Sequence, residues 1–148
     1  MGEAGALKIP LEIMDEMTGG ADNLADWLRI REHRSALLLE EDVDISLFHQ
    51  VISEGYASDL DDTVLIEVGR DPFLIAYAMA APHDRHVVAS EVSKPTCRRA
   101  NRRIPDVCNH FGVRWCDSFT MVRTLDFSTA WRGRLNSRPD AEAPARRP

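Results

Sequence analysis

The chain of 148 residues has little lysine, few cysteines and no long apolar run. Lys8 and Lys94 are its only lysines, and 24 acidic residues outnumber 18 basic ones. The net charge of -6 argues against a broadly basic nucleic-acid-binding protein. No segment approaches the roughly 18 consecutive apolar residues of a membrane-spanning helix. We therefore expect a soluble protein with no membrane partner.

The three cysteines are odd in number and do not form the paired pattern of a disulfide-stabilised domain. Cys97, Cys108 and Cys116 fit reduced thiols in the cytosol better than a disulfide framework. Together with His110 they contain the ligand types of a structural zinc site, but no Cys-x-x-Cys pair is present, which favours free thiols. The opening MGEAGALKIP also lacks the features of a secretory signal. These absences predict a cytoplasmic location.

Several common enzyme signatures are also missing. The sequence has no glycine-rich phosphate-binding loop, no dinucleotide-binding fingerprint and no serine or cysteine nucleophile constellation. This narrows the enzyme classes to metal-assisted hydrolysis. The composition, 44% hydrophobic and 28% charged, is that of one ordinary globular domain.

The apolar spacing predicts four helices in the first half of the chain. One begins at Pro10 in IPLEIMDEMTGG and stops at the glycine pair, and a second, DNLADWLRIREHR, is capped by Asn23. A third helix is predicted over residues 45–56 and a fourth over 71–81. The polar cluster ASDLDD and the residues through Gly69 are interpreted as a connection.

The second half is predicted to alternate between short strands and helices. HVVAS is typical of a buried strand and VRWC of a last short strand, and IPDVCNHFG predicts a helix closed by Gly112. SKPTCRRANRR is a positively charged loop, and Ser118 is a cap for a final helix, FTMVRTL. Residues 128–148 form a Pro-, Arg- and Ala-rich tail that we expect to be disordered.

Two acids stand at positions that point to a metal. Asp71 precedes the apolar helix DPFLIAYAMA, and Glu91 follows the strand HVVAS. A carboxylate opening a buried helix and one ending a parallel strand meet at the sheet edge where ligands of α/β folds bind. Two such acids are costly to bury without a cation. Glu12 and Glu16, four residues apart, share one face of the first helix.

The blocks IPLEIMDEM, DPFLIAYAMA, VVASEVSK and IPDVCNHFGV resemble a bacterial PIN-like family of unknown function, related to VapC-type toxin ribonucleases. The resemblance implies an α/β fold, a PIN-like three-layer α/β/α domain with a small parallel sheet, over residues 1–127. Family members open with a strand ending in aspartate, which nothing before Lys8 supplies, so the usual first strand is lacking. Either the start lies upstream, which we favour, or the protein is a degenerate relative.

The resemblance also implies a function. The protein is expected to be a magnesium- or manganese-dependent endoribonuclease, the toxin component of a toxin–antitoxin pair, with RNA as substrate and a cognate antitoxin as partner. Its catalytic residues would be Glu16, Asp71 and Glu91. The implied metal ligands are Glu12, Glu16, Asp71, Glu91 and Asp106. The alternative is a non-catalytic interaction module that binds an antitoxin or forms a homodimer.

Each candidate acid also has a purely structural interpretation. Asp71 can be only a helix N-cap, and Glu91 can simply end an edge strand. Glu12 and Glu16 can form a solvated helix face. For Asp106 a capping role or a bond to the neighbouring arginines is favoured over metal binding.

Two further groups have competing interpretations. The arginines of the loop can contact RNA phosphates or be merely solvated; they are Arg98, Arg99, Arg102 and Arg103. The aromatic residues Trp27, Phe111 and Trp115 are interpreted as core rather than as platforms for stacking bases.

Overall fold

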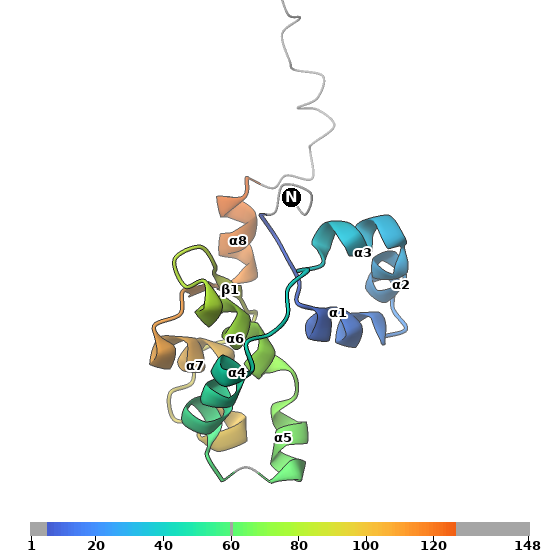
Figure 1. Ribbon diagram of the computed structural model, residues 1–148. Coiled ribbons are helices and arrows are strands. Elements are labelled where there is room, and N and C mark those ends of the chain that lie inside the picture. Colours follow the sequence, from blue (N-terminus) through green and yellow to red (C-terminus); the bar gives the residue numbers. More distant parts are fainter. Residues whose placement is uncertain (1–5, 60, 127–148) are drawn as a thin grey trace, which may run out of the picture.

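The computed structural model describes residues 6–59 and 61–126, which form a mostly helical α/β fold (Figure 1). Within these residues there are eight α-helices, one π-helix, one 3-10 helix and two strands. The elements of the first half are α1 (Leu11–Thr18), α2 (Asn23–Arg29), α3 (Arg31–Leu37), α4 (Ile45–Gln50), the π-helix η1 (Val51–Tyr56) and α5 (Asp62–Val68). Those of the second half are α6 (Asp71–Ala80), β1 (Val87–Val88), the 3-10 helix η2 (Arg99–Asn101), α7 (Ile104–Phe111), β2 (Trp115–Cys116) and α8 (Ser118–Thr124).

The first three helices form an N-terminal lobe that stands beside the rest of the molecule (Figure 1). Its buried hydrophobic residues are few: Met14, Ala25 and Leu28. A parallel bridge between Ile9 and Leu38 closes the base of the lobe, with hydrogen bonds of 2.8 and 2.9 Å on either side. The lobe is therefore held by a small core and by this bridge, and it contacts the body through α1 and α6.

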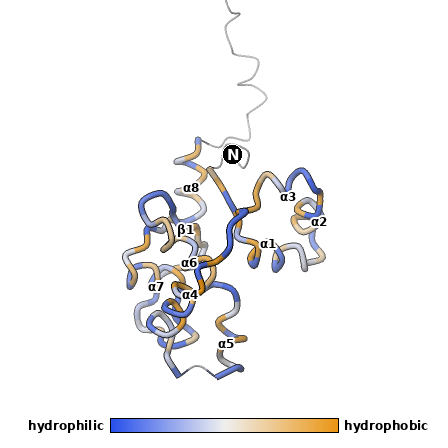
Figure 2. Tube along the Cα trace, in the orientation of Figure 1, coloured by the Kyte–Doolittle hydropathy of each residue, from blue (hydrophilic) through white to orange (hydrophobic). Residues whose placement is uncertain are grey.

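The body, which comprises α4 to α8 with the strands, is built around α6. This helix is apolar on most of its surface, and Ile75 and Ala76 have no exposed surface. Against it pack α4, η1, α7 and β1. In Figure 2 the tube carries many hydrophobic residues in this region, whereas the link between α3 and α4 is hydrophilic. The core cluster contains Val51, Tyr56, Val68, Ile75, Ala76, Ala78, Val87, Ala89, Ile104, Val107, Cys108 and Val113. Burial of this surface is the main stabilising contribution to the body.

The sheet is small and parallel, as expected from the two apolar runs. Val87 pairs with Trp115 and Val88 with Cys116, so the predicted strands HVVAS and VRWC each contribute only two residues. Gly112 ends α7 in the left-handed conformation, with φ 67°, as predicted for this position. The carboxyl end of β1 leads into the loop that carries Glu91.

The helix between η1 and α6 was not predicted from the sequence. Residues 62–68 form α5, whereas ASDLDD through Gly69 was interpreted as a connection. The helix exposes Leu65 and Ile66 and buries Val68, so it has little of the apolar face by which helices are recognised. Gly69, with φ 63°, ends it.

Helix caps and one boundary also differ from prediction. The caps of α2 and α8 are Asp22 and Asp117, each one residue before the predicted Asn23 and Ser118; their carboxylates accept from Ala25 N at 2.8 Å and Thr120 N at 2.6 Å. Aspartate is as good a cap as asparagine or serine, so a sequence with both side by side does not fix the choice. The expected helix DNLADWLRIREHR is broken at Ile30, whose ψ of 124° is extended.

The predicted helix over residues 45–56 is present, but its second half is a π-helix. The Ala57 N–H donates to the Ile52 carbonyl at 3.1 Å, which is the wider hydrogen-bond spacing of such a turn. Gly55 is buried at this point. A Cβ at this position would lie 2.8 Å from Val107 Cγ1 and 2.9 Å from Phe111 Cε2. The wide turn and the glycine let η1 approach α7 closely.

Among the described residues, no helix is long and apolar enough to cross a membrane. The expected disordered tail, residues 128–148, lies outside the described residues.

Candidate functional site

Asp71 is the centre of the candidate site. It is the first residue of α6, and its side chain does not cap the helix: the N-cap is Arg70, and no capping hydrogen bond forms. None of the hydrogen bonds or ion pairs of the described residues involves the Asp71 carboxylate. Burial first, and then the negative charges of Glu91 and Glu16, raise the pKa of Asp71 to about 6. A half-buried carboxyl group without a cationic partner therefore faces two other acids.

Glu16 acts on Asp71 through its charge from the N-terminal lobe. It lies in the last turn of α1, is exposed, and its negative charge acts on Asp71. Glu12, one turn earlier, lies in a different environment beside Tyr77 of α6. Its Oε2 atom is buried without a hydrogen-bond partner, while the Tyr77 hydroxyl donates to the Glu41 carbonyl at 3.1 Å. Burial, followed by the charge of Glu12, raises the pKa of Tyr77 to about 12.

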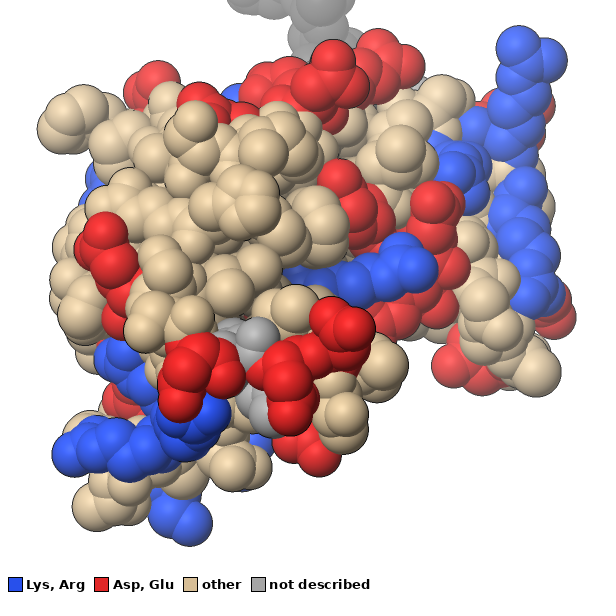
Figure 3. Space-filling model, turned by 60° about the horizontal axis from the view of Figure 1, so that its bottom comes forward, with Lys and Arg blue, Asp and Glu red and all other residues tan. Residues whose placement is uncertain are grey.

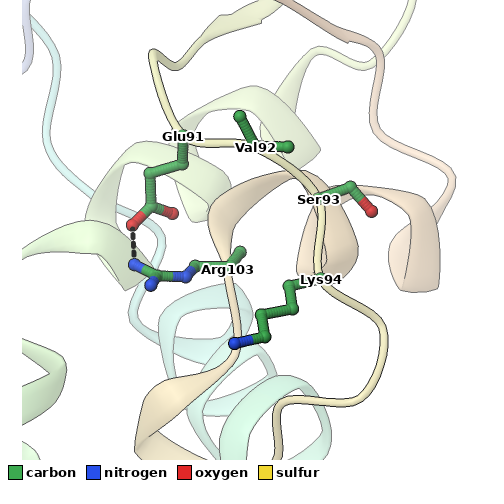
Figure 4. Close-up of a pocket in the computed structure, with 5 residues that line it drawn as sticks. All are labelled: Glu91, Val92, Ser93, Lys94 and Arg103. Atoms are coloured by element: carbon green, nitrogen blue, oxygen red, sulfur yellow. Dashed lines mark hydrogen bonds and ion pairs between the residues drawn. The ribbon is translucent and has the colours of Figure 1, made fainter.

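Glu91 follows β1 and is already engaged by the protein. Its Oε1 accepts from Arg103 Nη1 at 3.0 Å, and its Oε2 accepts from the Ile104 backbone N–H at 2.8 Å, at the start of α7. Figure 4 shows this pair in an open depression of about 310 Å³, lined by Glu91, Val92, Ser93, Lys94 and Arg103. The Lys94 side chain extends on the same side of the loop as Arg103. Glu91 is thus paired with one cationic side chain, Arg103, while its charge also acts on Asp71.

The Asp106 carboxylate is engaged by hydrogen bonds within the fold. It is buried in the first turn of α7, where its Oδ1 accepts from Ser93 Oγ at 2.5 Å and its Oδ2 from the Lys94 backbone N–H at 2.8 Å. Both carboxylate oxygens therefore fasten the loop after β1 onto α7. The sequence favoured a capping role or a bond to the neighbouring arginines, but the partners of the carboxylate are Ser93 and Lys94. Arg102 donates instead to the Asp106 backbone carbonyl at 3.2 Å.

Tyr56, which the sequence did not single out, belongs to the same site. It ends η1 with 6% of its surface exposed, and its hydroxyl is buried with no hydrogen-bond partner. Burial and the charges of Asp71, Cys108 and Glu91, in that order, raise the pKa of this phenol. No sequence signal marks it, because Tyr56 sits at the end of an apolar helical pattern that is equally typical of a core residue.

The acids come together electrostatically but not as a preformed ligand cage. In the described part of the chain, no three His, Cys, Asp or Glu side chains form a group that could hold a metal ion. This also applies to the zinc alternative. Cys97, Cys108 and Cys116 are free, and burial raises the pKa of Cys108 to about 12, so its thiolate is disfavoured.

The arginines near Cys97 are bound within the protein. Arg99 pairs with Asp59 at 2.7 Å, and Arg98 donates to the Pro95 carbonyl at 2.6 Å. Arg102 donates to the Gly55 carbonyl. Figure 3 shows the face on the side of α5, where acidic groups are scattered and basic groups lie both among them near the middle and toward the edges. On this face the coloured residues form no continuous basic track.

The prediction that the large aromatic residues are core is wrong for Trp27. This side chain is 44% exposed and stacks on His33 with ring centroids 4.0 Å apart. Trp115 and Phe111 pack against the core cluster, half-buried, as expected.

Comparison with known families places the chain. A domain of unknown function, DUF4411, matches residues 1–129. Comparisons with curated proteins and with solved structures gave no match. The match spans most of the sequence, including every residue of the candidate site. The chain therefore belongs to the DUF4411 family.

Proposed function

We propose that this protein is a PIN-like, magnesium- or manganese-dependent endoribonuclease, the toxin component of a toxin–antitoxin pair. One observation carries the proposal: the negative charges of Glu91 and Glu16, from two distant parts of the chain, both act on Asp71, whose pKa is raised to about 6 without a cationic partner. Perturbed carboxyl groups of this kind are enriched at functional sites. The resemblance of the blocks around these residues to PIN-like nucleases supplies the reaction class.

The donor atoms suit a hard divalent cation. Magnesium and manganese prefer carboxylate oxygens and bind through a few of them together with water. Asp71 and Glu16 have no hydrogen-bonded partner among the described side chains, and the negative charge of Glu91 acts on Asp71. In the described residues these three acids do not form a ready ligand group, so they would have to move closer together to hold the ion, with Glu12 the reserve ligand on α1. Asp106 is excluded from this proposal because it is buried and Ser93 and the Lys94 backbone occupy both its oxygens. Glu91 is more exposed, and to bind the ion it would have to release its bonds to Arg103 and the Ile104 N–H.

The residues of the chain provide the remaining functions. When bound, the cation supplies an activated water and stabilises negative charge at phosphorus. Arg103 and Lys94, at the depression beside Glu91, would bind the phosphates of RNA that approach the acids. Asp106 holds the backbone of that loop in place. The proposed site would therefore combine an acidic centre with a cationic margin, an arrangement compatible with phosphodiester cleavage.

The direct test measures cation binding and RNA cleavage together. Asp71→Asn and Glu16→Gln are compared with Asp15→Asn, a neighbouring acid on α1 that pairs with Arg34 at 3.0 Å and serves as control. We expect Asp71→Asn to reduce manganese-dependent cleavage roughly 100-fold and Glu16→Gln roughly tenfold. Asp15→Asn should match the unmodified chain.

A contrary result would be equally clear. Equal cleavage by the unmodified chain and Asp71→Asn would remove Asp71 from the mechanism. Absence of manganese binding by electron paramagnetic resonance at millimolar concentrations would end the metal proposal.

The second candidate function is a non-catalytic interaction module that binds an antitoxin or forms a homodimer. It is favoured by the engagement of Glu91 with Arg103 and by the exposed apolar side chains of the N-terminal lobe. Leu24, Trp27 and Ile30 are 51%, 44% and 46% exposed, around α2. Sedimentation of the chain and of a Leu24→Ser, Trp27→Ser variant tests self-association. A dimer lost in the variant, without manganese binding, would favour this function over the nuclease.

A further inference from the structure

A groove of about 230 Å³ lies where the N-terminal lobe joins the body. Leucines and acids line it in equal number: Leu11, Leu38, Leu39, Glu40, Glu41 and Asp42. Leu11 begins α1, and the others are consecutive residues at the end of α3 and in the link between α3 and α4. Figure 1 shows this link as an outstretched connection from the lobe to the body. The groove therefore combines apolar side chains with a run of negative charge.

Two of the three acids of the groove have no counter-ion. Glu41 is paired, because Arg85 Nη2 donates to its Oε1 at 2.6 Å and to its Oε2 at 2.7 Å. Within the described residues, no hydrogen bond or ion pair involves the side chain of Glu40 or of Asp42, and both residues are exposed. Acids this close in the chain repel one another, so a bound cation relieves that repulsion as well as forming ion pairs. The charge of the groove is complementary to a basic partner.

The link that lines the groove also has a free backbone edge. On one side it pairs with Ile9, which bonds to the Leu37 carbonyl at 2.8 Å and to the Leu39 N–H at 2.9 Å. Backbone groups of an extended chain point alternately to its two sides, so the Glu40 N–H points away from Ile9. Among the described residues, the N–H groups of residues 40–43 have no hydrogen-bond partner. Extended peptides add as a strand to edges of this kind.

We propose that this groove binds an extended segment of a partner protein in which cationic and apolar side chains alternate. Glu40 and Asp42 are two residues apart, and side chains at this spacing share one face of an extended chain. Cations two residues apart in the bound strand therefore lie opposite both acids. The side chains between these cations lie on the other face, as Leu39 does in the link. The inference goes beyond the proposed nuclease activity and does not depend on it, because no residue of the groove is a proposed cation ligand.

The charges are tested with a short synthetic peptide in which arginine and leucine alternate, whose binding to the full chain is measured by fluorescence anisotropy. Glu40→Gln combined with Asp42→Asn should weaken binding roughly tenfold, because two ion pairs are lost. Glu32→Gln combined with Glu67→Gln removes the same charge from exposed positions on α3 and α5 and should leave the dissociation constant unchanged. A peptide of the same composition with all its arginines first should bind more weakly than the alternating one.

The apolar side chains and the backbone edge have their own measurements. Leu11 is 43% exposed, so Leu11→Ser spares the core and should weaken binding of the alternating peptide several-fold. Ile66→Ser, at a position 80% exposed on α5, is the control and should have no effect. In the unmodified chain, the Glu40 amide should exchange its hydrogen more slowly when the peptide is bound, whereas the amides of α5 keep their rates.

Three results would overturn the proposal. Equal weakening by the two pairs of acid substitutions would reduce binding to a general attraction between a basic peptide and an acidic protein. Unchanged exchange at Glu40 with the peptide bound would exclude strand addition. Tighter peptide binding after Arg132→Gln, Arg134→Gln and Arg138→Gln together would show that arginines of this chain compete for the groove, and the chain itself would replace the partner as occupant. These measurements need neither a cation nor RNA cleavage.

Discussion

The free-energy cost of burying the Asp71 carboxyl group can be measured directly as a change of stability with pH. Folding raises its pKa from 3.8 to about 6, chiefly by burial. Below pH 4 the folded and unfolded chains both keep the proton, and the carboxyl group carries no penalty. Between pH 4 and pH 6 only the unfolded chain ionises, so stability falls as pH rises through this window.

This predicts a pH-dependent benefit of Asp71→Asn. Each unit of pKa difference corresponds to about 1.4 kcal/mol, which solvent screening of this half-buried group reduces to a total of about 1 to 2 kcal/mol. Urea unfolding in EDTA should show the variant gaining this advantage between pH 4 and pH 7. Asp15→Asn retains Asp71 and is the control. A pH-independent difference between Asp71→Asn and the unmodified chain would contradict the assignment.

Asp106 separates a structural acid from a cation ligand. Its two oxygens accept from Ser93 and from the Lys94 backbone, in a buried position. Asp106→Ala leaves the Lys94 N–H without its partner and should lower the free energy of unfolding by about 1 to 3 kcal/mol. Chemical denaturation checks the loss, and manganese affinity at a temperature where the variant is folded should be retained. A variant of full stability that no longer binds manganese would return Asp106 to the ligand set.

The sequence predicted these acids unequally well, for physical reasons. Asp71 and Glu91 flank apolar runs, and position in a run is visible in a single sequence. The environment of Glu16 depends on how α1 lies against α6, and local patterns do not contain that information. The hydrogen-bond partners of Asp106 are Ser93 and Lys94, which lie in the loop after β1 and are distant from Asp106 in the sequence. Tyr56 was missed because a core tyrosine and a site tyrosine look alike until the hydroxyl is seen to be unpartnered.

At the scale of elements, η1 is the feature on which the geometry of the site depends. A Cβ at Gly55 would meet side-chain atoms of Val107 and Phe111 at under 3 Å, so the two helices would have to separate. Gly55→Ala should therefore cost about 1 to 3 kcal/mol of stability, the range of overpacking in a core. Gly20→Ala, where the nearest atom is 3.5 Å away, is the control. Thermal or urea unfolding measures both, and equal stability of the Gly55→Ala variant would show that η1 and α7 are loosely packed.

The elements themselves were predictable where burial is strong. Residues 71–80 and 104–111 form the helices expected from their apolar content, proline positions and, for α7, Gly112. The weakly packed α5 was missed because its apolar side chains are largely exposed. The change from α to π hydrogen bonding within residues 45–56 leaves the apolar spacing almost unaltered, so the sequence pattern does not reveal it.

At the scale of the whole molecule, the site joins two parts of unequal stability. Glu16 lies on the N-terminal lobe, while Asp71, Glu91 and Tyr56 belong to the body. The lobe buries only three hydrophobic residues, whereas the body contains the main core cluster. Regions with few buried apolar contacts open at lower free energy. The effect of the Glu16 charge on the pKa of Asp71 therefore depends on how firmly the lobe packs against the body.

Arg70 is the contact through which this docking can be tested, because its guanidinium donates to the Glu12 backbone carbonyl across the interface between α1 and α6. Native-state hydrogen exchange should show faster exchange of amides in α1 to α3 than in α6 and α7. Arg70→Met removes the bond and should lower the free energy of opening of the lobe by about 1 kcal/mol while leaving α6 and α7 protected. Arg29→Met, which loses bonds only within the lobe, to Thr18, Gly20 and Asp26, is the control for an effect specific to docking. If Arg70→Met accelerated exchange in α6 and α7 equally, the lobe and the body would open as one cooperative unit, and Glu16 could not be released from Asp71 without unfolding the core.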